Sequence, residues 1–452
     1  MKRILIDPSA PRRENAEKIV KLALPVIVVN LLYTVESMFS LVLVSGISPS
    51  AVASVGFSLS LLWFIYSLMA LSYTGTSVLV SQRVGAGSDP SPVLSLGLGL
   101  SFLIALPLTF YGKDMTLYIM ELLGASPHVL SLSSEYLDPI FRFIVIGFMT
   151  NTFYGAFNGA GDTKTPMKVA LLMNVLNVSV SYCLIYGKLG FPELGVEGAG
   201  WGIVVSESVA FVIYFYLTAF KKKPFPPKLV ADVFLLREML RIGTPTAVER
   251  AITSLSFNVF VGFLARFGDE VLAAHQIGLR IESISFMIGF GFMVASTVIV
   301  GQNYGARNFP GLVYSVKFIS NLTAALMGFL GLLLIIFPKY LTLPFSRDPE
   351  VVGWAVYYLI IVGISQVPMA YAVIFSGALK GMGRTMAPML INITSFWMFR
   401  IIPSYILLKV LDSPLVPWTF MTVEMFARAM LMYIALRREL RLQSQSSSPP
   451  PD

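Results

Sequence analysis

Two glutamates interrupt long apolar stretches of the sequence. Glu36 lies in "LLYTVESMF" and Glu249 lies in "TPTAVERAI". An ionisable group at membrane depth is expensive to keep there and is a functional candidate by default. A carboxyl group in an apolar environment can bind a proton, a sodium ion or an organic cation in competition, because burial disfavours its bare charged form. We therefore treat both glutamates as candidate cation-binding groups.

The two candidates differ in their neighbours. No lysine or arginine lies near Glu36 along its stretch, whereas Arg250 adjoins Glu249. Arg280 and Glu282 are expected on the helix that follows, so a structural ion-pair cluster around Glu249 is an equally good interpretation. We assign Arg280 and Glu282 a structural or gating role.

Two further acids, Glu424 and Glu207, also differ in whether a basic residue lies nearby. Glu424 and Arg428 are spaced i, i+4 and are expected to support their helix as an ion pair. Glu207, which corresponds to Glu424 in the internal repeat described below, has no such partner at that spacing.

The composition indicates a membrane protein. The chain has 452 residues, of which 56% are hydrophobic and 13% are charged, and its mean hydropathy is +0.75. A soluble domain usually carries about a quarter charged residues. The single cysteine, Cys183, excludes an intramolecular disulfide. No phosphate-binding loop, metal-ligand cluster or catalytic triad is recognisable, so we predict no enzyme, no cofactor and no resident metal.

Apolar runs separated by glycine, proline and charge predict an all-α fold with twelve spans of roughly 20 residues or more. We expect an N-terminal lobe at 1–220, a basic, proline-rich linker at 221–232, a C-terminal lobe at 233–440 and a disordered tail at 441–452. The twelve spans are expected near 16–46, 51–82, 91–112, 134–157, 164–187, 199–220, 233–267, 271–303, 311–337, 350–380, 385–411 and 415–437.

The distribution of lysine and arginine predicts the orientation. With twelve spans, most basic residues fall on one side, together with both termini and the linker "KKKPFPPK" at 221–228. The positive-inside rule makes that side cytoplasmic. We expect a multi-pass protein of the cell (inner) membrane, and the net charge of +8 reflects topology rather than nucleic-acid binding.

The two halves of the chain repeat each other. "VSQRVGAGSDP" at 80–90 matches "VGQNYGARNFP" at 300–310 in five of eleven positions, with an offset of 220. "NGAGDTKTP" at 158–166 matches "KGMGRTMAP" at 380–388 with an offset of 222, and Trp201 and Glu207 match Trp418 and Glu424 with an offset of 217. Six spans per half predict two bundles related by a parallel pseudo-two-fold axis along the membrane normal, with a substrate cleft between them.

The first matched pair of motifs contains a glutamine in each half. Gln82 and Gln302 are expected at the cytoplasmic ends of their helices, each followed by a Gly-Ala pair. A structural turn is one interpretation of this motif and a gating role is the other.

Five stretches together resemble the multidrug and toxic compound extrusion (MATE) family. They are "LALP" (22–25), "GAGDTKTP" (159–166), "LGVEGAG" (194–200), "AAHQIGLRIES" (273–283) and "VGQNYGA" (300–306). The resemblance spans about residues 15–440. It implies two six-helix lobes and export of organic, often cationic, drugs in exchange for protons or sodium by alternating access.

The resemblance also marks positions where this chain departs from the family. Where the family commonly has acids on helices 1, 5 and 7, this chain has Ser40, Ser181 and Thr253. Glu36 and Glu249 each lie one helical turn before such a position and share a face with it. Asn177 matches the asparagine of the helix-5 pattern. We therefore expect a cation- or substrate-binding set of Glu36, Ser40, Asn177, Ser181, Glu249 and Thr253.

Two functions remain open at this stage. The first is a drug/cation antiporter that has small organic molecules and the lipid bilayer as its partners, binds no nucleic acid and works as a monomer. The alternative is a flippase for lipid-linked sugars or related amphiphiles of the same architecture. A pyrophosphate-binding flippase should have a strongly cationic interior, which the inner halves of helices 1, 2 and 5 lack.

Overall fold

The computed structural model describes residues 3–446, with side chains described for residues 3–443. Within residues 3–446 the chain is helical and contains no β-strand. Eleven helical segments there are long and apolar enough to cross a membrane, and a pair of helices bent by 56° makes a twelfth. The predicted all-α fold with twelve spans is confirmed.

The described residues form two compact units. Unit 1 contains residues 24–247, and unit 2 contains residues 3–23 and 248–446. These bounds differ from the expected lobes. Residues 3–23 of the first half belong to unit 2, and residues 221–247, which include the linker and the start of the second half, belong to unit 1. Buried apolar side chains explain the difference: Ile6 is buried in unit 2, and Phe225 of the linker is buried in unit 1.

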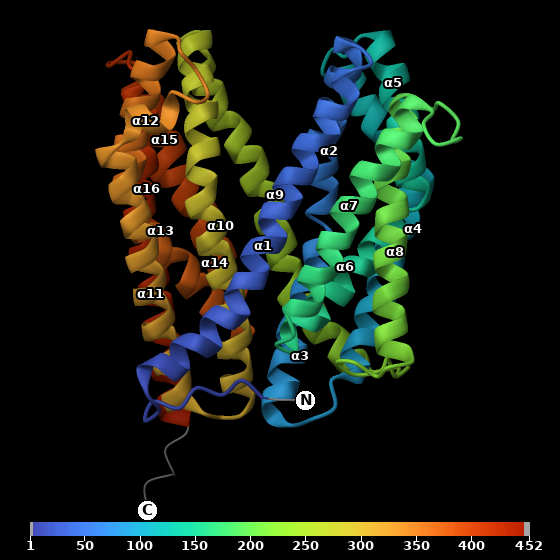
Figure 1. Cartoon of the computed structure of the whole chain (residues 1–452). Coiled ribbons are helices and arrows are strands. Elements are labelled where there is room, and N and C mark those ends of the chain that lie inside the picture. Colours follow the sequence, from blue (N-terminus) through green and yellow to red (C-terminus); the bar gives the residue numbers. More distant parts are fainter. Residues whose placement is uncertain (1–2, 447–452) are drawn as a thin grey trace, which may run out of the picture. The chain divides into compact units, whose positions relative to one another are not determined.

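Unit 1 is built from seven complete helices and parts of two others, and Figure 1 labels each of them. In chain order the helices of the first half are α1 (Arg12–Ser45), α2 (Pro49–Tyr66), α3 (Met69–Ala86), α4 (Ser91–Leu122), α5 (Pro127–Arg142), α6 (Ile144–Gly159), α7 (Lys164–Tyr186) and α8 (Val196–Ala219). The bent span is the pair α5 and α6. The first turns of α1 belong to unit 2.

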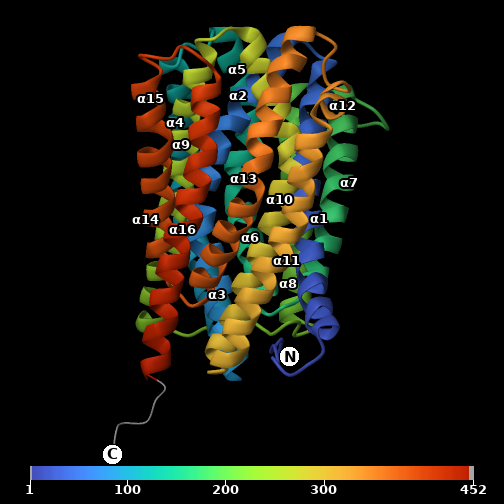
Figure 2. The same ribbon diagram turned by 90° about the vertical axis from the view of Figure 1, so that its left-hand side faces the viewer.

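Unit 2 repeats the pattern with a longer central helix. Its half of the chain contains α9 (Val233–Ala265), α10 (Asp269–Gly305), α11 (Phe309–Ile336), α12 (Pro338–Thr342), α13 (Pro349–Gly381), α14 (Met386–Ser395), the π-helical segment η1 (Phe396–Ile401), α15 (Ile402–Leu407) and α16 (Leu415–Ser446). Helix α13 packs against α10, α11 and α16, as Figure 2 shows. The first turns of α9 belong to unit 1.

Several helices begin with the same local signal. Ser48, Ser126 and Asp348 each accept a hydrogen bond from a backbone N–H of the first turn that follows. A proline occupies the next position in each case. A capping side chain satisfies an otherwise unpaired N–H, and proline at the first helical position loses nothing because its missing N–H would have been unpaired there. These caps fix where α2, α5 and α13 start.

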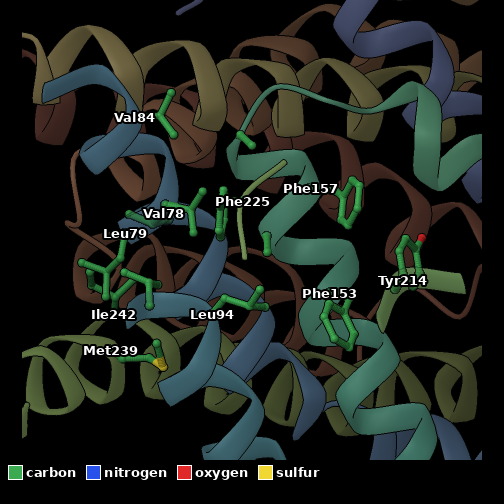
Figure 3. Packing of buried hydrophobic residues seen from close by; sticks show 14 of the residues in the cluster. Val78, Leu79, Val84, Leu94, Phe153, Phe157, Tyr214, Phe225, Met239 and Ile242 are labelled. Atoms are coloured by element: carbon green, nitrogen blue, oxygen red, sulfur yellow. The ribbon is translucent and has the colours of Figure 1, made fainter. Parts of the chain in front are cut away.

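The core of unit 1 includes residues from the linker and from α9. Phe153, Phe157 and Tyr214 form its aromatic part (Figure 3). Phe225 and Met239 pack into the same buried cluster. Residues beyond 220 therefore complete this core, which the predicted lobe boundary had divided.

Three elements differ from the sequence prediction. The expected helix 51–82 is two helices, α2 and α3, that meet at Ser67 and Leu68. The expected helix 134–157 begins earlier, at Pro127, and bends at Phe143. The expected tail 441–452 is helical as far as Ser446, because α16 continues without a breaker, and residues 447–452 lie outside the described residues.

Candidate functional site

Glu36 on α1 is the first member of a chain of polar side chains in unit 1. The Asn177 side-chain amide on α7 donates a hydrogen bond to the Glu36 carboxylate. The Ser181 hydroxyl in turn donates to the Asn177 amide oxygen at 3.0 Å. Asn177 and Ser181 are buried and Glu36 is half-buried. Three of the six expected site residues are thus brought together.

The local sequence of α7 and α8 creates this arrangement. Asn177 and Ser181 are spaced i, i+4, so they present one polar face of α7. Gly202 on α8 lies against that face: a Cβ atom at this position would lie 2.9 Å from the Asn177 amide oxygen and would overlap the Ser181 hydroxyl. Gly202 therefore lets α8 pack closely without displacing the two polar groups.

Ser40 does not join the side-chain chain. Its hydroxyl donates to the backbone carbonyl of Glu36 at 3.1 Å. Such a bond along the same helix satisfies the hydroxyl locally. Ser40 lies one turn from Glu36, as its spacing predicted, but its hydroxyl is turned to the helix backbone.

Glu207 on α8 is a second acid in this region, although it was not among the six expected site residues. It is half-buried and lies within electrostatic range of Glu36. Its carboxylate rests against Gly147 on α6, where a Cβ atom would lie 2.6 Å from Oε2. No residue among 3–443 donates a hydrogen bond to Glu207 or forms an ion pair with it. The internal repeat could have indicated this lack of a partner, because the position that matches Arg428 is occupied by Phe211.

Glu249 has a different environment in unit 2. It forms an ion pair with Lys380 on α13, at 3.0 Å, and accepts a hydrogen bond from the Asn392 amide at 2.6 Å. The expected partners Arg250 and Arg280 are exposed, and neither forms an ion pair with Glu249. Lys380 is the last residue of the predicted span 350–380, and it is buried. Thr253 is half-buried, and its side chain forms no hydrogen bond with the residues that the structure describes.

Glu424 and Glu282, two further acids inside the spans of unit 2, also have polar partners. The buried Glu424 forms ion pairs with Arg400 and with Arg428, each at 2.6 Å. The predicted Glu424–Arg428 pair is therefore present, and Arg400 of η1 is an additional member that the sequence pattern had not indicated. Glu282 accepts a hydrogen bond from the Tyr358 hydroxyl at 2.7 Å.

The repeated glutamine motif of unit 2 binds the start of the described chain. The backbone N–H of Ile4 donates to the Gln302 amide oxygen at 2.7 Å, and that of Ile6 donates to the Asn303 amide oxygen at 3.3 Å. The Asn308 amide donates to the Ile6 carbonyl at 3.1 Å. Gln302 thus anchors an extended segment, whereas Gln82 is half-buried at the matching position of unit 1.

A metal centre is not formed by the described residues. No group of three or more histidine, cysteine, aspartate or glutamate side chains among residues 3–443 is placed to hold a metal ion. The candidate site is therefore the acid-amide-hydroxyl chain of unit 1, and the ligand chemistry it offers is that of oxygen atoms around one negative charge.

Comparison with known proteins gives consistent results along the chain. The family model MatE matches residues 25–183 and 245–406. A probable multidrug resistance protein NorM of Thermotoga maritima is 30% identical over 434 residues, which cover 92% of this chain and 91% of that protein. Multidrug resistance protein PmpM of Pseudomonas aeruginosa is 26% identical, covering 95% and 92%. A FAD transporter of Shewanella oneidensis is 25% identical, covering 77% and 78%.

Solved structures share the fold. A crystal structure of MATE in the bent conformation superposes with a TM-score of 0.90 at 20% identity, over 96% of this chain and 97% of that one. A MOP superfamily transporter from Pyrococcus furiosus superposes with a TM-score of 0.86 at 20% identity, over 94% and 96%. MATE proteins are transporters rather than enzymes and need no cofactor. This multi-pass membrane protein belongs to the MatE family.

Proposed function

We propose that the protein is a secondary antiporter that exports organic, often cationic, compounds in exchange for protons or sodium by alternating access. In this proposal Glu36, Asn177 and Ser181 form the coupling site. The multidrug resistance proteins among its relatives support the substrate class. The chemistry of Glu36 supports the coupling.

The observation that carries the proposal is the set of partners around Glu36. Its carboxylate accepts a hydrogen bond from an amide, and no lysine or arginine among residues 3–443 forms an ion pair with it. A charged group in the membrane interior requires compensation. A proton, a sodium ion or an organic cation would each supply the missing positive charge. Competition of these ions for one carboxylate, combined with alternating access, would couple their exchange.

Glu249 is a weaker candidate for the same role. Lys380 already neutralises it, so a second cation would have to displace a buried ammonium group. We accordingly assign Glu249 and its neighbour Thr253 to the structure of unit 2. Glu207 lacks a compensating charge, as Glu36 does, and we propose that it attracts cations to the same region of unit 1.

The orientation and oligomeric state are part of the proposal. We place both termini and the basic linker 221–228 in the cytoplasm of a cell whose inner membrane holds the protein, on the basis of the lysine and arginine distribution. We propose that a monomer is functional.

The paired cations of unit 2 do not support the flippase alternative, which would have to use the exposed Arg250 of α9 and Arg280 of α10. Lys380, Arg400 and Arg428 are each bound to a glutamate. None of them is left to hold a pyrophosphate.

The test is transport by the purified protein in liposomes. A fluorescent organic cation is followed under an imposed pH gradient and, separately, under a sodium gradient. We expect one gradient to drive uptake or release by the wild-type protein and Glu36→Gln to abolish that coupling. The active gradient names the coupling ion.

Ser40→Ala is the matched control, because it changes a side chain one turn away that bonds only to the α1 backbone. We expect it to retain coupled transport. Full coupled transport by Glu36→Gln would overturn the proposed site, and absence of transport by the wild-type protein under both gradients would overturn the proposed function.

A further inference from the structure

The linker between the two halves carries a cluster of basic residues that have no acidic partners. Lys221, Lys222 and Lys223 follow the end of α8, and all three side chains are exposed. None of the three forms an ion pair with a residue among 3–443. Lys228, further along the linker, lies 3.9 Å from the Asp89 carboxylate, and both of these side chains are more than half exposed. The linker therefore presents a concentrated positive charge to its surroundings.

Contacts with unit 1 hold this linker in place. The backbone N–H of Lys223 donates to the Leu217 carbonyl at 2.9 Å, and Phe225 is buried in the core cluster of unit 1. Asp89, which lies beside Lys228, belongs to the turn between α3 and α4. Figure 1 shows the segment crossing below the end of α8. The basic side chains are thus displayed from a backbone that is fixed at one end of this unit.

Aromatic residues at the end of α8 indicate the level of the membrane interface. The rings of Tyr216 and Phe220 stack at 5.8 Å between centroids, and both side chains are exposed. The Lys221 ammonium group lies 5.8 Å from the centroid of the Tyr216 ring. Exposed aromatic rings at the end of a spanning helix are typical of the boundary between hydrocarbon and headgroups. The lysine cluster therefore begins at the depth of the lipid headgroups.

Large apolar side chains are exposed next to the same lysines. Leu229 is 96% exposed, Val233 is 79% exposed and Phe234 is 74% exposed. All three lie between Lys228 and the exposed Arg237 of α9. Exposed apolar side chains beside basic residues are the combination that binds an anionic membrane surface, because the apolar groups enter the acyl boundary while the cations contact phosphate.

The length of α9 places its first turns at the membrane surface. Its 33 residues extend about 50 Å at a rise of about 1.5 Å per residue, whereas the hydrocarbon core of a bilayer is about 30 Å thick. Arg237, Glu238 and Arg241 all lie in the first three turns of the helix. Charged groups are costly inside the hydrocarbon. The turns around Val233 and Phe234, which precede these charges, therefore lie at the surface of the bilayer.

The internal repeat shows that the fold does not require apolar residues here. At the offset of 220, the three exposed apolar residues correspond to Ser9, Arg13 and Glu14, which are exposed as well. Burial supports this register, because Met239 of α9 and the matching Ile19 of α1 are both fully buried. The segment that leads into α1 thus has polar residues where the linker and α9 expose apolar ones. The apolar character belongs to this segment and not to the architecture.

We propose that residues 221–234 form a membrane-surface anchor that binds anionic phospholipids. The three consecutive lysines contact the lipid phosphates, while Leu229 and Phe234 insert between the headgroups. A lysine is a compact cation suited to phosphate. An anionic lipid is favoured over an acidic protein, because the spans on both sides of the linker keep it at the bilayer and the rings of α8 set it at headgroup depth. The anchor does not depend on ion coupling at Glu36.

The first test measures whether anionic lipid engages the lysines. The full chain is placed in nanodiscs of phosphatidylcholine or of a phosphatidylcholine–phosphatidylglycerol mixture, and the acetylation of each lysine by acetic anhydride is followed by mass spectrometry. We expect Lys221, Lys222 and Lys223 to react about fivefold more slowly in the anionic discs and to recover at high salt, which screens the contact. Lys188 and Lys339, which are isolated and exposed, report the general effect of surface charge on lysine reactivity.

A second test locates the apolar part of the anchor. In a Cys183→Ser background, Leu229→Cys is labelled with an environment-sensitive fluorophore, and quenching by spin-labelled phospholipid is measured. We expect strong quenching, because the side chain lies among the lipid headgroups. The matched control is Ser9→Cys in the same background, at the repeat-related exposed position, and its fluorophore should be quenched several-fold less.

Substitution of the lysines tests the source of the lipid preference. The triple variant Lys221→Gln, Lys222→Gln and Lys223→Gln should lose most of the preference for spin-labelled phosphatidylglycerol over phosphatidylcholine, because the clustered charge is gone. The control variant removes the same charge from isolated exposed residues and should keep the preference. Its changes are Lys188→Gln, Lys339→Gln and Arg347→Gln.

The outcomes decide each part of the inference. Equal reactivity of the three linker lysines in both kinds of nanodisc, or an equal loss of lipid preference in the triple and control variants, would overturn the lipid-binding surface. Quenching at position 229 no stronger than at position 9 would overturn the insertion of the apolar side chains. Neither result would bear on the transport assay, which follows a different readout.

Discussion

The acids inside the spans differ in whether a cation accompanies them. Glu249 and Glu424 in unit 2 have basic partners, whereas Glu36 and Glu207 in unit 1 have none among the described residues. A buried ion pair contributes little net stability, but an acid without a partner must find its positive charge elsewhere. The difference at the level of single residues therefore separates structural acids from acids that can exchange ions.

Lys380 provides a direct test of the structural assignment. Lys380→Met should lower the free energy of unfolding by about 3 kcal/mol, because it leaves the largely buried Glu249 without its partner. The double variant with Glu249→Gln should recover most of that loss. Reversible unfolding in mixed micelles measures both.

Arg266→Ala is the control for this prediction. It removes the pair with Asp412, in which the side chains are 49% and 72% exposed. Exposed pairs of this kind are worth at most about 1 kcal/mol. A loss after Lys380→Met no larger than that of Arg266→Ala would contradict the assignment of Glu249 to the structure.

Substitution of the repeat-related acids Glu207 and Glu424 should affect the free energy of unfolding differently. Glu424→Gln leaves the buried Arg400 undercompensated and should destabilise the protein by about 3 kcal/mol. Glu207→Gln removes an unpaired charge from the interior and should leave stability unchanged or raise it by about 1 kcal/mol. The same unfolding assay compares the two variants. Equal destabilisation by both would show that the Glu207 carboxylate, like that of Glu424, stabilises the fold.

The helices are the scale at which the sequence was most informative. The lengths of the apolar runs predicted twelve spans, and the spacing of Asn177 and Ser181 predicted that both lie on one face of their helix, α7. The break between α2 and α3 at Ser67 and Leu68 could not be read, because neither residue is a helix breaker. The burial of Lys380 could not be predicted for a related reason: it lies in the last turn of α13, where a lysine is usually exposed, and only tertiary packing brings it against Glu249 of α9.

The bound N-terminal segment depends on the ends of α10 and α11. Asn308 caps α11 through the Gly311 N–H and also holds the Ile6 carbonyl. Within the segment, hydrogen bonds from the Ser9 hydroxyl and N–H lower the pKa of the Asp7 carboxyl below its ordinary value, so this turn keeps an ionised carboxylate at neutral pH. The segment is thus fixed at its two ends by different polar contacts.

Asn303 offers the sharpest probe of that segment. Asn303→Ala removes the acceptor of the Ile6 N–H and should increase amide hydrogen exchange across residues 3–10 by about tenfold. Exchange followed by mass spectrometry measures it. Asn321→Ala, which removes an exposed contact with Tyr371, is the control and should leave residues 3–10 protected. Unchanged exchange in both variants would mean that the bond to Asn303 is dispensable and that the remaining contacts of Ile4 and Ile6 hold the segment.

At the scale of the whole molecule, the two halves exchange their leading segments. Residues 3–23 belong to unit 2 and residues 221–247 to unit 1. Helices α1 and α9 each begin in one unit and continue in the other, and Pro25 and Pro245, which match at the repeat offset, lie near these crossovers. The core of each unit is therefore completed by residues from the other half of the sequence.

Division of the chain at the expected lobe boundary tests this exchange. A fragment of residues 1–220 lacks Phe225, Met239 and Ile242, which complete the buried cluster of unit 1, and loss of several large apolar side chains costs more than a domain can normally spare. We expect the fragment alone to be degraded by protease, and co-expression with residues 221–452 to restore a protease-resistant pair. A co-expressed second fragment that carries Phe225, Met239 and Ile242 all changed to alanine is the control and should fail to protect its partner. Because the three residues supply unit 1 from the other half, resistance of the 1–220 fragment by itself would show that each half folds on its own core and that the exchanged segments are dispensable.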